Sequence, residues 1–183
     1  MTACKKFLLL VSLICSSFFA QASVNTENNS DAFFKYFDFF IPKNWEIKDS
    51  PHKGELTFLS AKHSCIIHIN YDEAHFIKPN DRLNLSLNYQ KALAKSLSAT
   101  THDALSLKIA NPRSYKINNF DGYTFDYVNF FEDGRYLSGQ SFLLFDKAKG
   151  ALSVDINSIN YKTRKKCLND AKKYLKTLKT RKH

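Results

Sequence analysis

Hydrophobic and polar residues alternate along much of the chain, and this period of two predicts a protein built mainly from β-strands. In one such strand, Cys65, Ile67 and Ile69 share a face. The strands predicted in the first part of the chain are residues 36–41, 45–48, 56–61 and 65–71. Those predicted further on lie around residues 105–109, 115–117, 123–127 with 128–131, 136–137 with 142–145, and 152–156.

Two segments have the period of an α-helix instead. The first begins at an N-cap in residues 79–81 and runs to about Ser98, and the second spans residues 162–180. Between them, the dipeptide Asp133-Gly134 predicts a two-residue hairpin turn of type I′. The resulting order, βββ(β)-α-βββββ-α, predicts an α+β protein with a central antiparallel β-sheet flanked by helices.

The composition agrees with a single compact domain. The chain has 183 residues, of which 44% are apolar and 24% charged, with 5 glycines and 4 prolines. These values exclude disordered, collagen-like and low-complexity proteins. The glycines are scattered rather than clustered, so the sequence offers no phosphate-binding loop.

The order of elements and several landmarks carry a resemblance to a known family. The landmarks are an aromatic strand ending in Phe-Ile-Pro-Lys-Asn-Trp at residues 40–45, the turn Phe-Asp-Gly-Tyr at residues 120–123, a mid-chain helix and a closing helix. Over residues 32–178 the chain resembles the PsbP-like family, which includes the photosystem II extrinsic protein PsbP and bacterial DcrB-like periplasmic relatives. The resemblance implies a sheet sandwiched by helices and a non-catalytic binding or assembly factor. It supplies no ligand, cofactor or catalytic residue.

The beginning of the chain has the pattern of a secretory signal peptide. Lys5 and Lys6 precede an apolar run over residues 7–20, and Ala20-Gln21-Ala22 offers a cleavage site. We therefore expect an exported protein, either periplasmic or secreted as a host- or matrix-directed factor. The predicted organisation is a cleaved signal peptide at 1–22, a flexible lead-in at 23–31 and a single domain at 32–183.

Signal cleavage would leave two cysteines, Cys65 and Cys167, in an oxidising compartment. Cys65 lies on the apolar face of its strand, and Cys167 lies on the apolar side of the last helix. The sequence therefore predicts a disulfide that attaches this helix to the sheet. Two buried free thiols are the alternative.

The positive charge is concentrated at the C-terminus. Removal of the signal would reduce the net charge from +10 to +8, and residues 161–183 hold ten lysines and arginines against one acid, Asp170. On a helical projection, seven lysines occupy an arc of about 140° opposite the apolar side. These residues, here called the lysine stripe, are Lys162, Lys165, Lys166, Lys172, Lys173, Lys176 and Lys179.

The lysine stripe has two interpretations. A solvated face keeps a protein soluble and needs no partner. A segregated stripe also fits binding to an anionic lipid head group or to an acidic polysaccharide such as a glycosaminoglycan, because several engaged lysines together give salt-sensitive affinity. Nucleic acid is disfavoured as a partner, because the stripe lacks the arginines and stacking aromatics that base recognition favours.

Other residues suggest rival functions. The group that resembles metal ligands is His63, Cys65, His68, Asp72, Glu73 and His75. On a strand, His68 faces away from Cys65, so these side chains do not converge and we predict no metal site. A small hydrolase or metal-dependent enzyme stays an alternative, without a motif to support it.

Aromatic residues near the start of the domain offer a third possibility. Most of them have the period of core residues, but Phe33, Phe34 and Phe40 exceed what one buried face needs. They could form an exposed edge through which an envelope assembly factor binds a protein partner. The favoured prediction is a non-enzymatic binding protein without a cofactor or catalytic residue.

Overall fold

The computed structural model describes residues 29–41, 43–49, 54–60, 62, 64–72, 77–99, 104–146 and 150–181. The predicted signal peptide lies outside these residues. In chain order, with η for a 3₁₀ helix, the elements are α2 (Asn29–Tyr36), β1 (Phe37–Asp38), β2 (Glu46–Asp49), β3 (Glu55–Ser60), β4 (Cys65–Asp72), η2 (Pro79–Asp81), α3 (Arg82–Ala99), β5 (Ala104–Ile109), β6 (Arg113–Ile117), β7 (Phe120–Phe131), β8 (Tyr136–Asp146), β9 (Gly150–Ser158), η3 (Tyr161–Thr163), α4 (Arg164–Leu175) and β10 (Lys179–Thr180).

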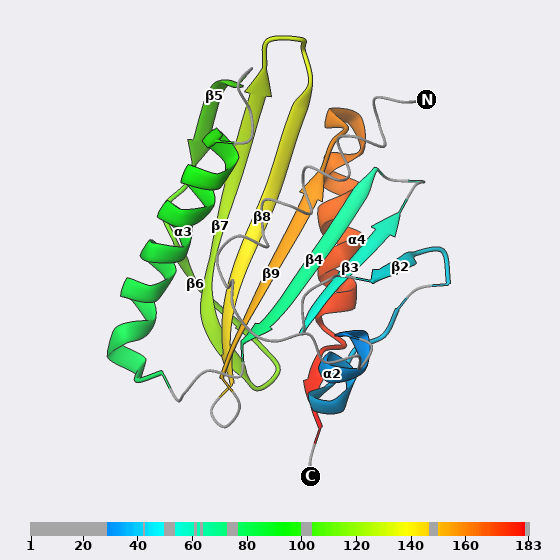
Figure 1. The fold of residues 1–183 in the computed structure, drawn as a ribbon, viewed down its shortest axis with the longest axis vertical. Coiled ribbons are helices and arrows are strands. Elements are labelled where there is room, and N and C mark those ends of the chain that lie inside the picture. The colour runs from blue at the N-terminus through cyan, green and yellow to red at the C-terminus, as the bar shows by residue number, and fades with distance from the viewer. Residues whose placement is uncertain are drawn as a thin grey trace.

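Within these residues, an eight-stranded antiparallel β-sheet forms the centre of the molecule (Figure 1). Its strand order is β2-β3-β4-β9-β8-β7-β5, and β6 also pairs with β7. β5 pairs with residues 127–131 of β7, whereas β6 pairs with residues 120–124. The predicted α+β class with a central antiparallel sheet is confirmed.

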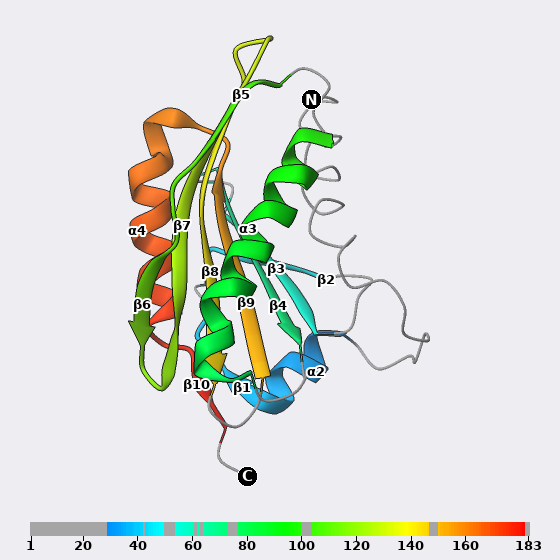
Figure 2. The ribbon, with the colours of Figure 1, turned by 90° about the vertical axis from the view of Figure 1, so that its left-hand side faces the viewer.

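Helices cover both faces of the sheet (Figure 2). α3 packs against β5 and β7 on one face, and α4 packs against β9, β4 and β8 on the other. The larger part of the core lies on the α4 side, where Phe58 of β3, Ile67 of β4 and Val154 of β9 are buried. α2 closes one end of this layer with Phe33. None of the described helices combines the length and apolar character that crossing a bilayer requires.

The chain before β2 differs from the prediction of a flexible lead-in followed by a strand over residues 36–41. α2 begins at Asn29, inside the expected lead-in, and only residues 37–38 form a strand. A helical turn brings the rings of Phe33 and Phe37 within 5.0 Å of each other, and both are buried in the core. A strand would separate these two positions by about 13 Å. The helical conformation is therefore favoured, because it allows both rings to be buried together.

The β7–β8 hairpin forms at the predicted place but with a longer loop, residues 132–135. A type I′ turn requires positive φ at both central residues, and only Gly134 has it, at 77°, whereas Asp133 does not. The N–H of Gly134 donates to the carbonyl of Phe131, and the N–H of Phe131 donates to the carbonyl of Arg135. The prediction of a two-residue turn is therefore wrong, although the hairpin is correct.

The C-terminal α-helix is shorter than the predicted 162–180, because it covers only Arg164–Leu175. Beyond it, the chain pairs as β10 with β1. The side-chain amide of Asn118 donates to the carbonyl oxygens of Lys176 and Leu178, at 3.0 and 2.6 Å. These long-range bonds satisfy backbone groups at the helix end and direct the chain away from helical continuation.

A row of polar residues, buried except for the partly buried Thr57, crosses the sheet face that α3 covers. Strand pairing puts four of them side by side: Thr57, His68, Asp155 and Ser141. The hydroxyl groups of Ser141 and of Tyr89, which belongs to α3, donate to the two carboxylate oxygens of Asp155. Thr57 Oγ1 lies 2.9 Å from His68 Nδ1. Because Asp155 is only 2% exposed, its bond from Tyr89 ties α3 to the sheet inside the core.

Replacing this carboxylate tests the link between α3 and the sheet. Asp155→Ala should lower the free energy of unfolding by about 3 kcal/mol, because two hydroxyl donors lose their acceptor in a buried site. Asp126→Ala is the matched control: its carboxylate pairs with Arg113 at the surface, and its loss should cost less than about 1 kcal/mol. Urea unfolding followed by circular dichroism measures both, and equal losses would contradict the structural role of Asp155.

Candidate anion-binding surface

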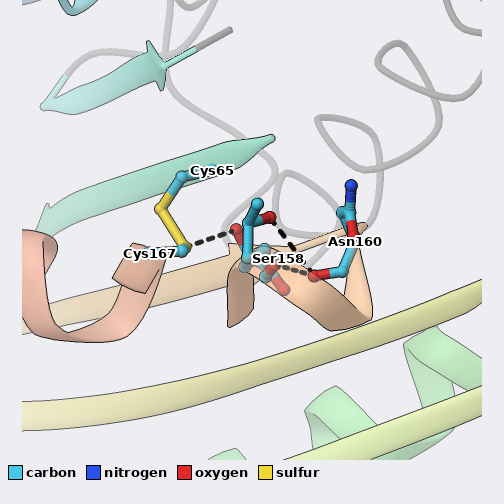
Figure 3. Close-up of a disulfide and its surroundings, with 6 residues drawn as sticks. Cys65, Ser158, Asn160 and Cys167 are labelled. Carbon is cyan, nitrogen blue, oxygen red and sulfur yellow. Dashed lines mark hydrogen bonds between the residues drawn. A yellow bond between two sulfur atoms is a disulfide. The ribbon is translucent and has the colours of Figure 1, made fainter. Parts of the chain in front are cut away.

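A disulfide between Cys65 of β4 and Cys167 of α4 holds the basic helix on the sheet (Figure 3). The Cα atoms of the two cysteines are 5.4 Å apart, and both residues are buried. Ala171 and Leu175, one and two turns further along α4, are fully buried on the same side. The predicted Cys65–Cys167 pairing is confirmed, and the apolar side of α4 faces the sheet as its pattern predicts.

The segment between β9 and α4 sets the start of the basic region. The side chain of Asn160 accepts a hydrogen bond from the backbone N–H of Lys162, at 3.0 Å, and so caps η3. Ser158, at the end of β9, donates its hydroxyl to the carbonyl of Asn160 at 3.0 Å (Figure 3). These two bonds turn the chain from the strand into the helix at a defined place.

The lysine stripe lies along the solvent side of η3, α4 and the residues that follow. Lys173 pairs with Asp170, whose carboxylate is 3.3 Å from the ammonium group. In the described part of the chain, the other six lysines form no ion pair. Lys172 is partly buried and the remaining members are exposed. Four of the seven predicted lysines lie on α4, whereas Lys162, Lys176 and Lys179 lie outside it.

A shallow cavity of about 540 Å³ adjoins the C-terminal end of the stripe, where β1 and β10 pair. Its polar lining comes from Asp38, Lys176, Thr177, Lys179 and Arg181. Arg181 Nε donates to the Asp38 carboxylate at 2.7 Å, so this pair is neutral and the two lysines leave the cavity positive. Sequence patterns do not predict the contribution of Arg181 and Thr177, because their position depends on the β1–β10 pairing.

Aromatic residues form the other wall of this cavity, namely Phe34, Phe39 and Phe40. Phe40 is 60% exposed, and its backbone N–H donates to the hydroxyl of Thr177 at 3.0 Å. Phe33 is fully buried, so of the three residues predicted as an aromatic edge only Phe34 and Phe40 lie near the surface. The lysine stripe and the aromatic edge, predicted as separate features, meet at this cavity.

The residues of the rival enzyme hypothesis do not assemble into a site in the described part of the chain. Cys65 is in the disulfide, and His68 lies on the opposite face of the sheet, as the strand pattern predicts. His63, Glu73 and His75 lie outside the described residues. No group of metal-binding side chains is present among the residues that are described.

The buried polar row also lacks the geometry of a catalytic relay. A serine nucleophile needs a base at its hydroxyl, whereas Ser141 donates directly to Asp155, and His68 contacts Thr57 instead. Ser141 is fully buried, so a substrate cannot reach its oxygen in this conformation.

At the β7–β8 hairpin, the backbone N–H of Arg135 donates to Asp133 and lowers the pKa of its carboxyl group. This favours the charged form of Asp133, which suits a residue in an exposed turn.

Comparison with known proteins identifies the fold. No protein-family model and no curated protein matches the sequence. The solution structure of cyanobacterial PsbP (CyanoP) from Synechocystis sp. PCC 6803 is similar over 90% of this chain and 99% of that chain, with a TM-score of 0.58. The chain has a PsbP-like fold. At 11% sequence identity the similarity concerns the fold alone.

A second structure with some similarity is LpqN of Mycobacterium tuberculosis, described as involved in cell envelope biogenesis. The match has a TM-score of 0.43 and 8% identity, and it covers 80% of this chain and 83% of that chain. The similarity to cyanobacterial PsbP confirms the PsbP-like arrangement expected from the sequence for the sheet and its flanking helices. The candidate anion-binding surface is inferred from the residues of this chain and not from these similarities.

Removing the disulfide tests how firmly the PsbP-like domain holds α4. The cysteines are 102 residues apart, and a loop of this length corresponds to about 4–5 kcal/mol of unfolded-state entropy. Replacing Cys65→Ala and Cys167→Ala together should lower the free energy of unfolding by about 4 kcal/mol in urea titrations. Wild-type protein in reducing agent should show a similar loss. A loss below about 1 kcal/mol in both cases would contradict a stabilising disulfide.

Proposed function

We propose that the chain is an exported, non-enzymatic binding protein that contacts an anionic partner through the lysine stripe. The partner is a surface of anionic lipid head groups or an acidic polysaccharide. The observation that supports this most directly is that six of the seven lysines form no ion pair among the described residues, and that three of these six lie on a helix whose other side is fixed to the sheet.

Lysines that have few acidic partners and belong to a helix attached to the sheet favour anion binding over a face that serves solubility alone. Acidic residues three or four positions from a lysine stabilise a helix, whereas α4 offers Asp170 alone for this purpose. Each lysine near an anionic surface contributes about 1 kcal/mol, so four or five acting together give useful affinity that falls with salt. Attachment to the sheet also reduces the entropy that ordering such a helix costs on binding.

The aromatic edge supports a second candidate, an envelope factor that binds a protein partner. Phe40 is a large apolar side chain that is mostly exposed beside the cavity. Contiguous exposed apolar patches mark protein or membrane contacts, and the partly buried Phe34 and Phe39 extend the apolar wall of the cavity beside Phe40. This candidate shares its surface with the lysine stripe, so experiments on the two groups of residues separate them.

Charge reversal tests the proposed function. Replacing Lys165→Glu, Lys172→Glu and Lys176→Glu together should weaken binding of residues 23–183 by roughly 100-fold at low salt, since three favourable contacts are lost. Binding is measured by co-sedimentation with vesicles of phosphatidylglycerol and phosphatidylcholine, and by retention on heparin, at several salt concentrations.

The matched control carries the same change in charge on the other side of the sheet. It combines Lys78→Glu, Lys91→Glu and Lys95→Glu, all exposed at or before α3. This control should bind within a factor of about three of wild type, because salt screens the changed charges from a partner that contacts the other side of the sheet. Absence of wild-type binding to both ligands at low salt would overturn the proposal, as would equal loss in both triple variants.

A further inference from the structure

Exposed aromatic residues lie at both ends of α4. At its N-terminal end, Tyr161 of η3 is 73% exposed and Phe130 of β7 is 41% exposed. The ring of Tyr136 lies between them, with centroids 5.5 Å from Tyr161 and 5.4 Å from Phe130. These three residues, here called the upper aromatic group, therefore form one contiguous patch from three segments of the chain.

The upper aromatic group lies on the same side of the sheet as α4. Phe130 and Tyr136 are paired across β7 and β8, so their side chains share one face. Tyr136 has the same parity along β8 as Phe142 and Leu144, which pack in the core cluster that contains Cys167 of α4.

The other end of α4 carries the lower aromatic group, Phe40 with Tyr174. Their ring centroids are 6.3 Å apart, and Tyr174 also contacts the ring of Trp45 edge to face, at 5.8 Å. Tyr174 is partly buried and packs against the more exposed Phe40. Thr177 anchors this arrangement, because its hydroxyl accepts from Phe40 N–H and donates to the carbonyl of Tyr174 at 2.7 Å.

The two aromatic groups and the lysine stripe therefore share one side of the molecule. A 12-residue helix is about 18 Å long, so the aromatic groups are roughly 20 Å apart with the lysines between them. Aromatic rings favour the boundary between lipid head groups and acyl chains, and lysines there reach the phosphate groups. A soluble acidic polysaccharide would be recognised by the cations and would not require exposed apolar rings at both ends.

We infer that this side of the molecule docks flat on an anionic lipid bilayer, with the lysine stripe on the head groups and Phe40 and Tyr161 in the interfacial layer. The inference rests on the proposed function and specifies its anionic partner as a membrane surface. The protein lies on the membrane in this arrangement, and α3 faces away from it.

Tryptophan probes at the two ends test the docking directly. The sequence has a single tryptophan, Trp45, so Trp45→Phe provides a background without native emission. Phe40→Trp and Tyr161→Trp, each in this background, should show blue-shifted emission with phosphatidylglycerol-containing vesicles and quenching by lipids with brominated acyl chains. Leu83→Trp is the matched control, because Leu83 is an exposed apolar residue of α3 and should show neither effect.

A binding measurement complements the probes. Replacing Phe40→Ala and Tyr161→Ala together in the otherwise wild-type chain should reduce partitioning into these vesicles by about tenfold and leave heparin retention unchanged. Circular dichroism of each variant confirms that it is folded.

The outcomes separate this inference from the proposed function. If the protein binds the vesicles while both probes stay unshifted and unquenched, the docking geometry is overturned and electrostatic binding stands. Retention on heparin without vesicle binding also overturns the inference, because the partner is then a polysaccharide. Failure to bind either ligand at low salt overturns the proposed function itself.

Discussion

The attachment of α4 to the sheet determines where the positive charge of this molecule lies. Cys167, Ala171 and Leu175 are fully buried, and the disulfide joins the helix covalently to β4 in the middle of the sheet. With that side fixed, the lysines at the remaining positions of the helix have to face solvent. The charge is therefore carried by a helix that is attached to the sheet, which is the property that both proposals depend on.

The sequence predicts much of the PsbP-like fold because period-two strands and a long amphipathic helix are local patterns. Cys65 and Cys167 could be paired in advance, since each lies on the apolar face of its own element. The errors occur where contacts between distant segments decide the local structure. α2 forms because its turn buries Phe33 against Phe37, and α4 ends early because Asn118 donates to the carbonyls of Lys176 and Leu178 and the chain then pairs as β10 with β1.

The residues of the candidate surface likewise fall into those that a local sequence pattern predicts and those that only tertiary contacts bring together. The lysine stripe is visible in the sequence because its members follow one another along a single segment. The upper aromatic group is not, because Tyr161 meets Phe130 and Tyr136 only after β7, β8 and η3 have come together. The sequence predicts Phe40 at an exposed edge, but its contact with the stripe depends on Thr177, 137 residues away in the chain. These tertiary contacts add an apolar component to a surface that the sequence alone describes as basic.

Lysine footprinting on membranes tests the central claim most directly, because every lysine of the chain reports at once. The protein is acetylated with and without phosphatidylglycerol-containing vesicles, and the modification of each lysine is measured by peptide mass spectrometry. The account predicts that Lys165, Lys173 and Lys176 become several-fold less reactive on vesicles, while the exposed Lys91 and Lys95 of α3 stay unchanged. Protection of the α3 lysines instead, or equal protection on both sides of the sheet, would contradict it.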